Sequence, residues 1–511
     1  MDALIPLFVA IPLMVAFLIV LLGKLVKGIH RLLAPLTLLA LLLMAVFEFS
    51  GLGGISRTYA MGGWNADGGF PVGIFLVLDG FSVLMLCIIN LIGLVALFYS
   101  LSYMSRYTAE AHYYALFCLI VAGMNGVVLS GDLFNLFVFL EVSVIASYAL
   151  VAFGVGKTEL EASFKYQVLG GLASMLILLA IGLIYWKTKT LNLADVRHVL
   201  DAGYSRPFYV FVQVLLIAGF GLKAAIIPFH AWLPDAHSSA PSPISAMLSG
   251  VLIKAVGIYV LIRLFFNMFV FSHEIALVLT SLGAISMVLG SLLAIMQWDV
   301  KRLLAYSSIS QIGYVVMAFG MGILLLLKGD QEAAAILAIG GGIYHMINHA
   351  VFKGLLFLNA GSLEYRLDTR DLKEMGGLSK AMPVTATTSF MASMSISGIP
   401  PFNGFFSKLI IIIAAINGRF YLLATLAVVV SIITLGYFLK FQRYAFFNKA
   451  GKAAEKIKEV PFPMSFSMIF LAILCVGLSL LAIPSISDTV LRPAIDVLIQ
   501  PELYSTTIIG I

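Results

Sequence analysis

The chain has 511 residues, of which 61% are hydrophobic and only 11% are charged. A soluble protein carries roughly a quarter of its residues as charged side chains, so this composition excludes a soluble globular protein and indicates a polytopic membrane protein. The formal net charge of +6 is no sign of nucleic-acid binding in this class, because lysine and arginine collect in the cytoplasmic loops of membrane proteins.

Apolar segments long enough to cross a bilayer recur along the whole chain. A spanning helix needs about 20 apolar residues, and this rule predicts an all-α membrane bundle of about 14 transmembrane helices. The connections are mostly short, so we expect one bundle rather than a string of separate domains. The predicted spans are 3–22, 32–49, 76–99, 113–129, 133–153, 163–186, 208–229, 243–267, 275–296, 303–326, 333–360, 383–416, 420–443 and 464–484.

The basic residues predict the orientation of these spans. If the first loop, GKLVKGIHR (23–31), is cytoplasmic, the loops on that side contain 18 of the 31 lysines and arginines and the outer loops contain eight. This bias follows the positive-inside rule and predicts a protein of the cell membrane with both termini outside.

Two predicted spans are interrupted by proline. The seventh runs into FGLKAAIIPFHAWLPDAH (220–237), and the twelfth contains SISGIPPFNGFFSK (395–408). Proline removes a backbone donor and breaks a helix, and unpaired backbone inside a membrane is tolerated only within protein or beside water. Lys223 and Lys408 accompany the two breaks, which lie five spans apart, a pattern typical of transporters built from repeats.

The repeats suggest a division of the chain into four parts. We expect three N-terminal helices in 1–112, a first repeat of helices 4–8 in 113–267 and a second repeat of helices 9–13 in 268–443. The fourteenth helix and the tail then occupy 444–511.

Five charged residues fall deep inside predicted spans: Glu141, Lys223, Lys254, Lys353 and Lys408. Each costs roughly 2.5–3.5 kcal/mol to insert at a helix centre, so they are unlike ordinary surface charges. One intramembrane lysine is compatible with a purely structural hydrogen bond between helices, but five charged residues on different spans favour a functional pathway. Arg263 lies near the outer end of its span, where we expect it to snorkel to the interface.

His345 and His349 precede Lys353 at intervals of four residues, which places all three on one helix face. Two histidines at this spacing also fit a zinc site, but the glutamate of an HExxH motif is absent and a lysine completes the row. Histidine changes charge near neutral pH, so the row favours proton transfer.

Glu141 and Lys223 are expected to form a switchable pair. Burial makes a lysine readier to release its proton, and a nearby carboxylate opposes this effect. Moving the carboxylate away would therefore release the proton into a relay of buried ionisable groups.

The three cysteines, Cys87, Cys118 and Cys475, are far apart and form no CxxC or CxxCH motif. We therefore expect no iron–sulfur cluster, haem or structural zinc bound by this chain.

Three stretches carry a resemblance to a known superfamily: residues 221–259, from GLKAAIIPFHAWLPDAH to the lysine helix GVLIKAVGIY, QWDVKRLLAYSSISQIGY (297–314) and YHMINHAVFKGLLFLNAG (344–361). They resemble the antiporter-like membrane subunits of respiratory complex I, of Mrp cation/proton antiporters and of membrane-bound [NiFe]-hydrogenases. SGDLFNLFVFLEV (130–142) is most similar to the Mrp D-type and hydrogenase branch.

The resemblance implies two inverted five-helix repeats with broken helices 7 and 12 and a polar axis across the midplane. The resemblance also implies that the five buried charged residues lie on this axis and form a proton path together with the two histidines. The path residues are Glu141, Lys223, Lys254, His345, His349, Lys353 and Lys408. Asp132 is expected first as a helix cap and only second as a path residue.

The resemblance also implies a function. The first hypothesis is a proton-translocating, non-catalytic subunit of a redox-driven complex, with [NiFe] or iron–sulfur clusters in a peripheral redox arm made by partner subunits. The alternative is an Mrp-type Na⁺/H⁺ antiporter subunit without redox coupling. A structural anchor without transport and an independent solute carrier also remain open.

Overall fold

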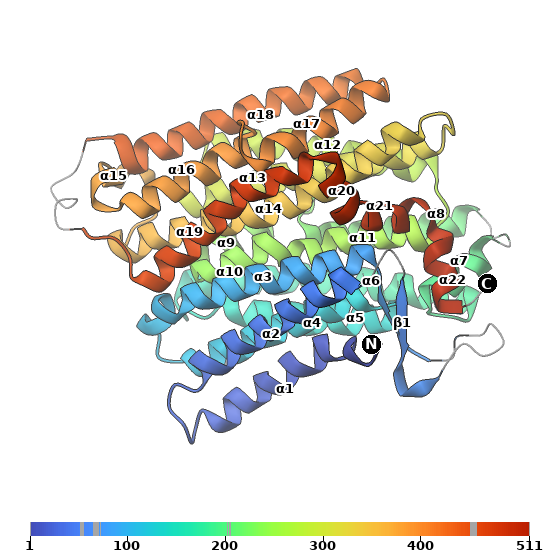
Figure 1. Cartoon of the computed structure of the whole chain (residues 1–511), viewed down its shortest axis with the longest axis horizontal. Coiled ribbons are helices and arrows are strands. Elements are labelled where there is room, and N and C mark those ends of the chain that lie inside the picture. The colour runs from blue at the N-terminus through green and yellow to red at the C-terminus, as the bar shows by residue number, and fades with distance from the viewer. Residues whose placement is uncertain are drawn as a thin grey trace.

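The computed structural model describes residues 2–51, 56–64, 71, 73–201, 203, 206–449 and 457–509. Most of these residues are helical, and the helices run side by side along the longest axis of the molecule (Figure 1). The prediction of a polytopic helical bundle is confirmed.

Twelve helical segments within the described ranges are long and apolar enough to span a membrane. They correspond to every predicted span except the first and the twelfth. The segments are His30–Gly51, Gly80–Arg106, Glu110–Leu129, Leu133–Val151, Lys157–Thr188, Arg206–Ala224, Ser242–Met268, His273–Ile295, Val300–Leu326, Glu332–Leu367, Tyr421–Phe447 and Phe462–Ala482.

The two remaining predicted spans form shorter helices. The first span is α1 (Leu7–Leu22), and the twelfth is divided into α16 (Pro383–Ser397) and α17 (Asn403–Asn417). The count of fourteen therefore stays a prediction. The chain ends at the same end of the bundle as it begins, near β1, α7 and α22 (Figure 1).

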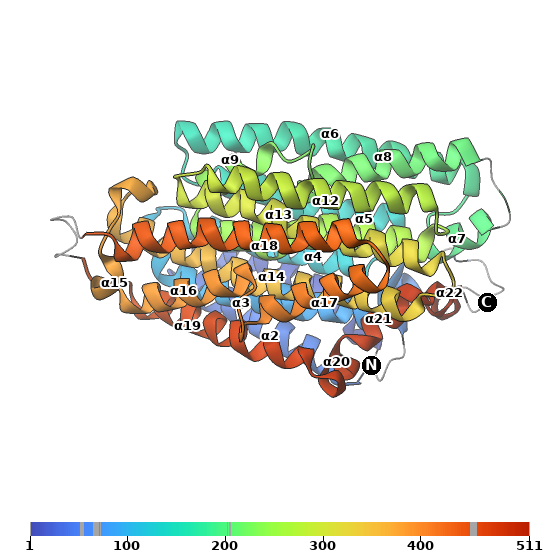
Figure 2. The same cartoon turned by 90° about the horizontal axis from the view of Figure 1, so that it is seen from above.

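The long helices make up the body of the bundle, with α6 and α8 along one edge and α19 and α20 along the opposite edge (Figure 2). Their bounds are α2 (His30–Gly51), α3 (Gly80–Tyr103), α4 (Glu110–Leu129), α5 (Leu133–Val151), α6 (Lys157–Thr188), α8 (Arg206–Ala224), α12 (His273–Ile295), α13 (Val300–Leu326), α14 (Glu332–Leu367), α18 (Tyr421–Gln442) and α19 (Phe462–Gly477).

Shorter elements connect or extend these helices. A two-stranded antiparallel sheet pairs β1 (Arg57–Ala60) with β2 (Phe75–Leu78). The short helices are α7 (Leu193–Asp201), α9 (Trp232–Ser239), α10 (Ser242–Met247), α11 (Val260–Arg263), α15 (Leu378–Ala381), α20 (Pro484–Val490), α21 (Arg492–Ile499) and α22 (Pro501–Ile509).

The first helix break separates α8 from α9 at residues 225–231, a segment that contains Pro228. Buried backbone groups need partners, and two side chains supply them here. The Trp232 indole donates to the carbonyl of Leu222 (2.8 Å), and the Ile227 N–H donates to the Ser286 hydroxyl (3.0 Å).

The second break separates α16 from α17 at residues 398–402. Gly404 lets the two half-helices meet, because a Cβ there would lie 1.9 Å from the carbonyl oxygen of Ser395. Asn348 on α14 and Asn403 at the start of α17 exchange two hydrogen bonds of 2.9 Å, which fix the break against α14.

The segment Ser242–Met268 is irregular over most of its length. It contains π-helical turns at Leu248–Leu252, Lys254–Tyr259 and Leu264–Met268 between and after α10 and α11. π-Turns inside long helices often mark functional positions, and this segment is fully buried in the centre of the bundle.

Candidate functional site

Glu141 on α5 and Lys223 on α8 lie together, with Ser174 on α6 between them. The Ser174 hydroxyl donates to Glu141 Oε1 (2.5 Å), and Lys223 Nζ donates to Ser174 Oγ (2.9 Å). The direct distance from Lys223 Nζ to Glu141 Oε1 is 3.6 Å. The lysine side chain is buried, whereas 27% of the Glu141 side chain is exposed.

Lys254 is fully buried inside the irregular segment. Its ammonium donates to the carbonyls of Ser249 (2.6 Å) and Gly250 (2.5 Å), the residues five and four positions earlier. The carbonyl oxygens of the π-turn therefore face the Lys254 ammonium, and these backbone dipoles take the place of a carboxylate.

Lys353 on α14 is also fully buried and has polar partners on α13. Its ammonium donates to the Leu304 carbonyl (2.7 Å) and to the Ser307 hydroxyl. Like Lys254, it is held by neutral oxygens.

His345 and His349 lie on the same buried face of α14 as Lys353. His345 Nδ1 is 3.0 Å from the Ser407 hydroxyl on α17. Within the described part of the chain, His345 Nε2 and both ring nitrogens of His349 have no hydrogen-bond partner. Lys254 is close enough to act electrostatically on both histidines.

Lys408 lies on α17, in the first turns after the second break. Its ammonium donates to the Ile396 carbonyl on α16 (2.8 Å) and lies 4.9 Å from the ring centre of Tyr314. Tyr314 in turn packs against His345, with ring centres 5.6 Å apart. Lys408 also lines a cavity of about 330 Å³ between α16, α17 and α18.

The seven predicted residues thus form two groups. Glu141 and Lys223 make one, and Lys254, the α14 row and Lys408 make the other. Among the described residues no hydrogen bond or ion pair joins Lys223 to Lys254. The lysines of both groups are buried and donate to hydroxyl or carbonyl oxygens.

Sequence reasoning missed Ser174 and His237. A serine gives no signal in an apolar span, but His237 belongs to the motif around the first break. It is fully buried on α9, its ring lies 4.6 Å from that of Phe357, and neither ring nitrogen has a partner in the described structure. Lys254, Lys301 and Lys353 all act on it electrostatically.

Lys301 lies between the ninth and tenth predicted spans (275–296 and 303–326), in a loop that the sequence predicts to be cytoplasmic, but its side chain is buried in α13. It forms an ion pair with Glu364 on α14 (2.7 Å), and Tyr103 and Ser242 also donate to this carboxylate, each at 3.3 Å. A charged cluster therefore lies between the predicted axis and one end of the bundle.

The expectation that Arg263 snorkels is wrong. The side chain is 3% exposed and forms a 2.8 Å ion pair with Asp79, the cap of α3. It points into protein because the segment that carries it is enclosed by other helices and Asp79 supplies a buried counter-charge.

Asp132 is the N-cap of α5, as expected. Its carboxylate accepts from the N–H groups of Phe134 (2.9 Å) and Asn135 (2.8 Å). Burial raises the pKa of the Asp132 carboxyl, and these two N–H donors oppose part of that rise. The structure places it at the end of a span and outside the two groups described above.

No group of three or more His, Cys, Asp and Glu side chains in the described ranges is arranged to hold a metal ion. The histidine row is flanked by lysines, which cannot ligate while protonated.

The fold and the buried row define a class, that of polytopic membrane proteins with charged residues at broken helices. Residues 130–434 match the family model described as NADH:quinone oxidoreductase/Mrp antiporter, TM, and residues 64–114 match the N-terminus of complex I chain 5. The chain therefore belongs to the NADH:quinone oxidoreductase/Mrp antiporter membrane family, as its motifs suggested.

Relatives of the chain match it over nearly its full length. It is 34% identical to the D-type subunit of the Na⁺/H⁺ antiporter of Alkalihalophilus pseudofirmus, over 97% of this chain and 98% of that protein. It superposes on a chain of the Mrp complex from Dietzia sp. DQ12-45-1b with a TM-score of 0.89 at 27% identity, covering 100% and 99% of the two chains. A chain of the archaeal membrane-bound sulfane sulfur reductase, a respiratory membrane complex, gives 0.88 at 28% identity and 99% coverage of both.

Proposed function

We propose that this chain is a proton-translocating, antiporter-like subunit of a redox-driven membrane complex of the membrane-bound hydrogenase or complex I-like kind. The observation that carries the proposal is the row of buried lysines and histidines on α14 and its neighbours, with histidine nitrogens that have no partner in the described structure. Uncompensated ionisable groups in a membrane interior are costly and mark proton pathways.

The Glu141–Ser174–Lys223 group would act as the switch of this pathway. While Glu141 stays near, its charge holds the proton on Lys223. When the carboxylate moves away, the buried ammonium loses its counter-charge and releases the proton towards Lys254. Because Ser174 bonds both partners, its hydroxyl can stay with the lysine while the carboxylate leaves.

The remaining residues would pass the proton on. His349 and His345 alternate between neutral and charged forms near neutral pH. We propose that they carry the proton from Lys254 to the terminal lysines Lys353 and Lys408. All three lysines are held by neutral oxygens that tolerate either protonation state. The proposal also includes the architecture expected from the sequence. The chain would have fourteen spans arranged as two inverted repeats, and it would lie in the cell membrane with both termini outside.

The two ends of the proposed path differ in exposure, because Lys408 is buried and only Glu141 is partly exposed. Glu141 is partly exposed on α5, and Lys408 borders the cavity beside α18. Relatives of known structure come from multi-subunit membrane complexes. We therefore propose membrane subunits as partners at these surfaces, and a peripheral arm with [NiFe] or iron–sulfur clusters that supplies the energy.

Exchange of Na⁺ for H⁺ without redox coupling is the second candidate. The 34% identity to a component of a Na⁺/H⁺ antiporter over 97% of the chain favours it. The same row would carry the proton, and Glu141, the partly exposed carboxylate of the switch, would be the candidate cation ligand.

The first experiment is gentle purification from native membranes, with identification of co-purifying subunits and metals, followed by reconstitution into vesicles. The proposal expects an iron–sulfur or [NiFe] arm and proton movement that begins when an electron donor is added. Metal-free membrane partners and proton movement that follows an imposed Na⁺ gradient would replace the redox proposal with the exchanger. Absence of any proton movement under both conditions would refute the two together.

A further inference from the structure

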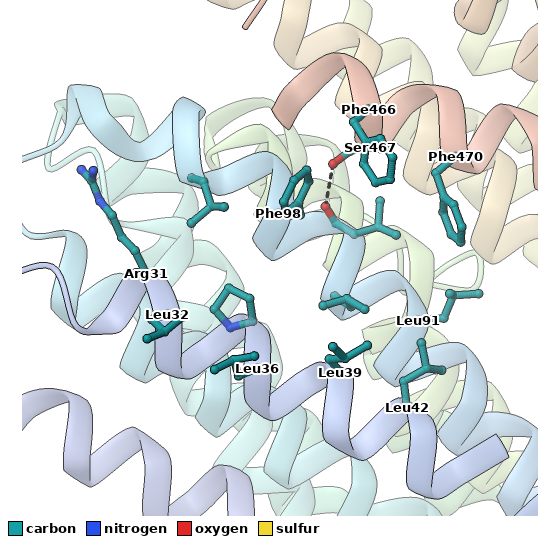
Figure 3. A pocket seen from close by; sticks show the side chains of 14 residues that line it. Arg31, Leu32, Leu36, Leu39, Leu42, Leu91, Phe98, Phe466, Ser467 and Phe470 are labelled. Atoms are coloured by element: carbon teal, nitrogen blue, oxygen red, sulfur yellow. Dashed lines mark hydrogen bonds between the residues drawn. The ribbon is translucent and has the colours of Figure 1, made fainter. Parts of the chain in front are cut away.

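An apolar groove of about 400 Å³ runs along the flank formed by α2, α3 and α19, and none of the residues of the ionisable row lines it (Figure 3). This flank is opposite the edge formed by α6 and α8 in Figure 2. Leucines of α2 and phenylalanines of α19 form its walls, and Arg31 stands at one end.

We propose that this groove binds the two acyl chains of an anionic phospholipid, with the phosphate at Arg31. The proposal concerns a lipid site and does not depend on the proposed function.

The lining of the groove suits hydrocarbon. Its hydroxyl group, Ser467 Oγ, already donates within the protein, to the carbonyls of Pro463 (2.9 Å) and Val95 (3.1 Å). Leu32, Leu36 and Leu39 remain between 40% and 61% exposed on the α2 side. A polar ligand would lose its hydrogen bonds to water here and find no replacement, whereas an acyl chain loses nothing.

The dimensions select lipid over a partner helix. From Arg31 to Leu42, eleven residues of α2 cover about 16 Å at 1.5 Å per residue. A hydrocarbon chain with a radius of roughly 2 Å, half of a carbon contact distance, fills about 200 Å³ over that length. Two chains therefore match the cavity of about 400 Å³, whereas a helix about 10 Å wide has a volume of roughly 1,250 Å³ over that length and would lie mostly outside the groove.

Arg31 gives the groove a charge preference. It donates through Nε (2.8 Å) and Nη2 (2.7 Å) to the carboxylate of Glu110, which orients the guanidinium. A guanidinium has five N–H donors, so three remain for a phosphate. The side chain is 48% exposed, and Lys24 and Lys27 are exposed in the preceding loop. The cluster therefore complements an anionic headgroup.

The test uses the whole complex in vesicles of phosphatidylglycerol and phosphatidylcholine, with retained lipid measured by native mass spectrometry after extraction. The wild type is expected to retain phosphatidylglycerol in preference to phosphatidylcholine. Arg31→Ala should weaken that preference about fivefold, the factor expected from roughly 1 kcal/mol per basic residue at a membrane surface. Arg31→Lys should keep most of it.

Leu39→Trp fills the groove and should remove the retained lipid of both kinds. Two matched controls should behave as the wild type. Arg206→Ala removes an exposed arginine that is paired with Glu274 at another helix start, and Leu178→Trp enlarges an exposed leucine on α6. Retention that is equal in every variant would show only ordinary surrounding lipid and overturn the proposal.

A photoreactive residue in place of Leu36 distinguishes a bound phospholipid from the other possible occupant of the groove, a partner polypeptide. Crosslinks to phospholipid support the proposal. Crosslinks to a partner polypeptide in the intact complex would replace it with a protein interface.

Discussion

Two of the ion pairs inside this bundle are built differently. Arg263 bonds Asp79 at 2.8 Å and also donates to Tyr259 and Asn267, while backbone N–H groups of α3 hold the carboxylate. Lys223 lies 3.6 Å from Glu141, and a single hydroxyl, that of Ser174, connects the two.

The difference shows which pair can open. Separating Arg263 from Asp79 would strand two buried charges, each fixed by several partners, so that pair is suited to holding the fold together. Separating Lys223 from Glu141 leaves the carboxylate a path to the surface, because 27% of its side chain is already exposed. A pair with one mobile partner is suited to switching.

The largest effect is expected from Lys223→Ala. Without the lysine the switch has no proton to hold, and groups that transfer protons typically contribute 10²–10⁴-fold to a rate, so proton movement should fall at least about a hundredfold. A pH-sensitive dye inside reconstituted vesicles measures the rate, and the amount of assembled complex should stay unchanged.

Lys328→Ala is the matched control, because Lys328 is an exposed lysine at the end of α13. It should leave the rate unchanged. If Lys223→Ala instead prevented assembly, the lysine would have the structural role that the comparison gives to Arg263.

Arg263→Leu should act on stability and leave the rate of the folded protein alone. Removing one partner of a buried pair leaves the other uncompensated and costs about 3–5 kcal/mol. Thermal unfolding in detergent should therefore occur at a clearly lower temperature. Arg206→Leu, which breaks an exposed pair with Glu274, should cost no more than about 1 kcal/mol. A stable Arg263→Leu protein would contradict the structural role.

Ser174→Ala should slow proton movement without abolishing it. The hydroxyl bonds a carboxylate and an ammonium, and hydrogen bonds to charged groups contribute about 1.5–3 kcal/mol, so a loss of roughly tenfold or more is expected. Ser174→Thr keeps the hydroxyl and should restore the rate. Ser291→Ala removes a buried hydroxyl of α12 that bonds only the Val288 carbonyl among the described residues, and it should have no effect on the rate. Equal rates in all three variants would remove Ser174 from the switch.

The contrast between the two pairs also shows which features of the fold and the site can be predicted from the sequence alone. Prolines and apolar runs predicted both helix breaks, and the cost of burying charge drew attention to the lysines. Hydropathy could not separate Lys301 in α13 from a loop lysine, or Arg263 from a snorkelling one, because their partners Glu364 and Asp79 are remote in sequence and only the fold brings them near. Ser174 carries no charge and shows no periodicity, so its place between two ionised groups becomes visible only in three dimensions.

The smallest effect is expected at Asp132, where substitutions distinguish a helix-capping role from a role in the proton path. As the N-cap of α5 it satisfies the N–H groups of Phe134 and Asn135. Asparagine caps a helix about as well as aspartate, whereas alanine costs about 1 kcal/mol. Asp132→Asn should therefore preserve both thermal stability and proton movement, and Asp132→Ala should lower stability slightly at an unchanged rate. If Asp132→Asn slowed proton movement while stability held, the carboxylate itself would be required, and the switch at Glu141 would have a second acidic group at the N-terminal end of its own helix.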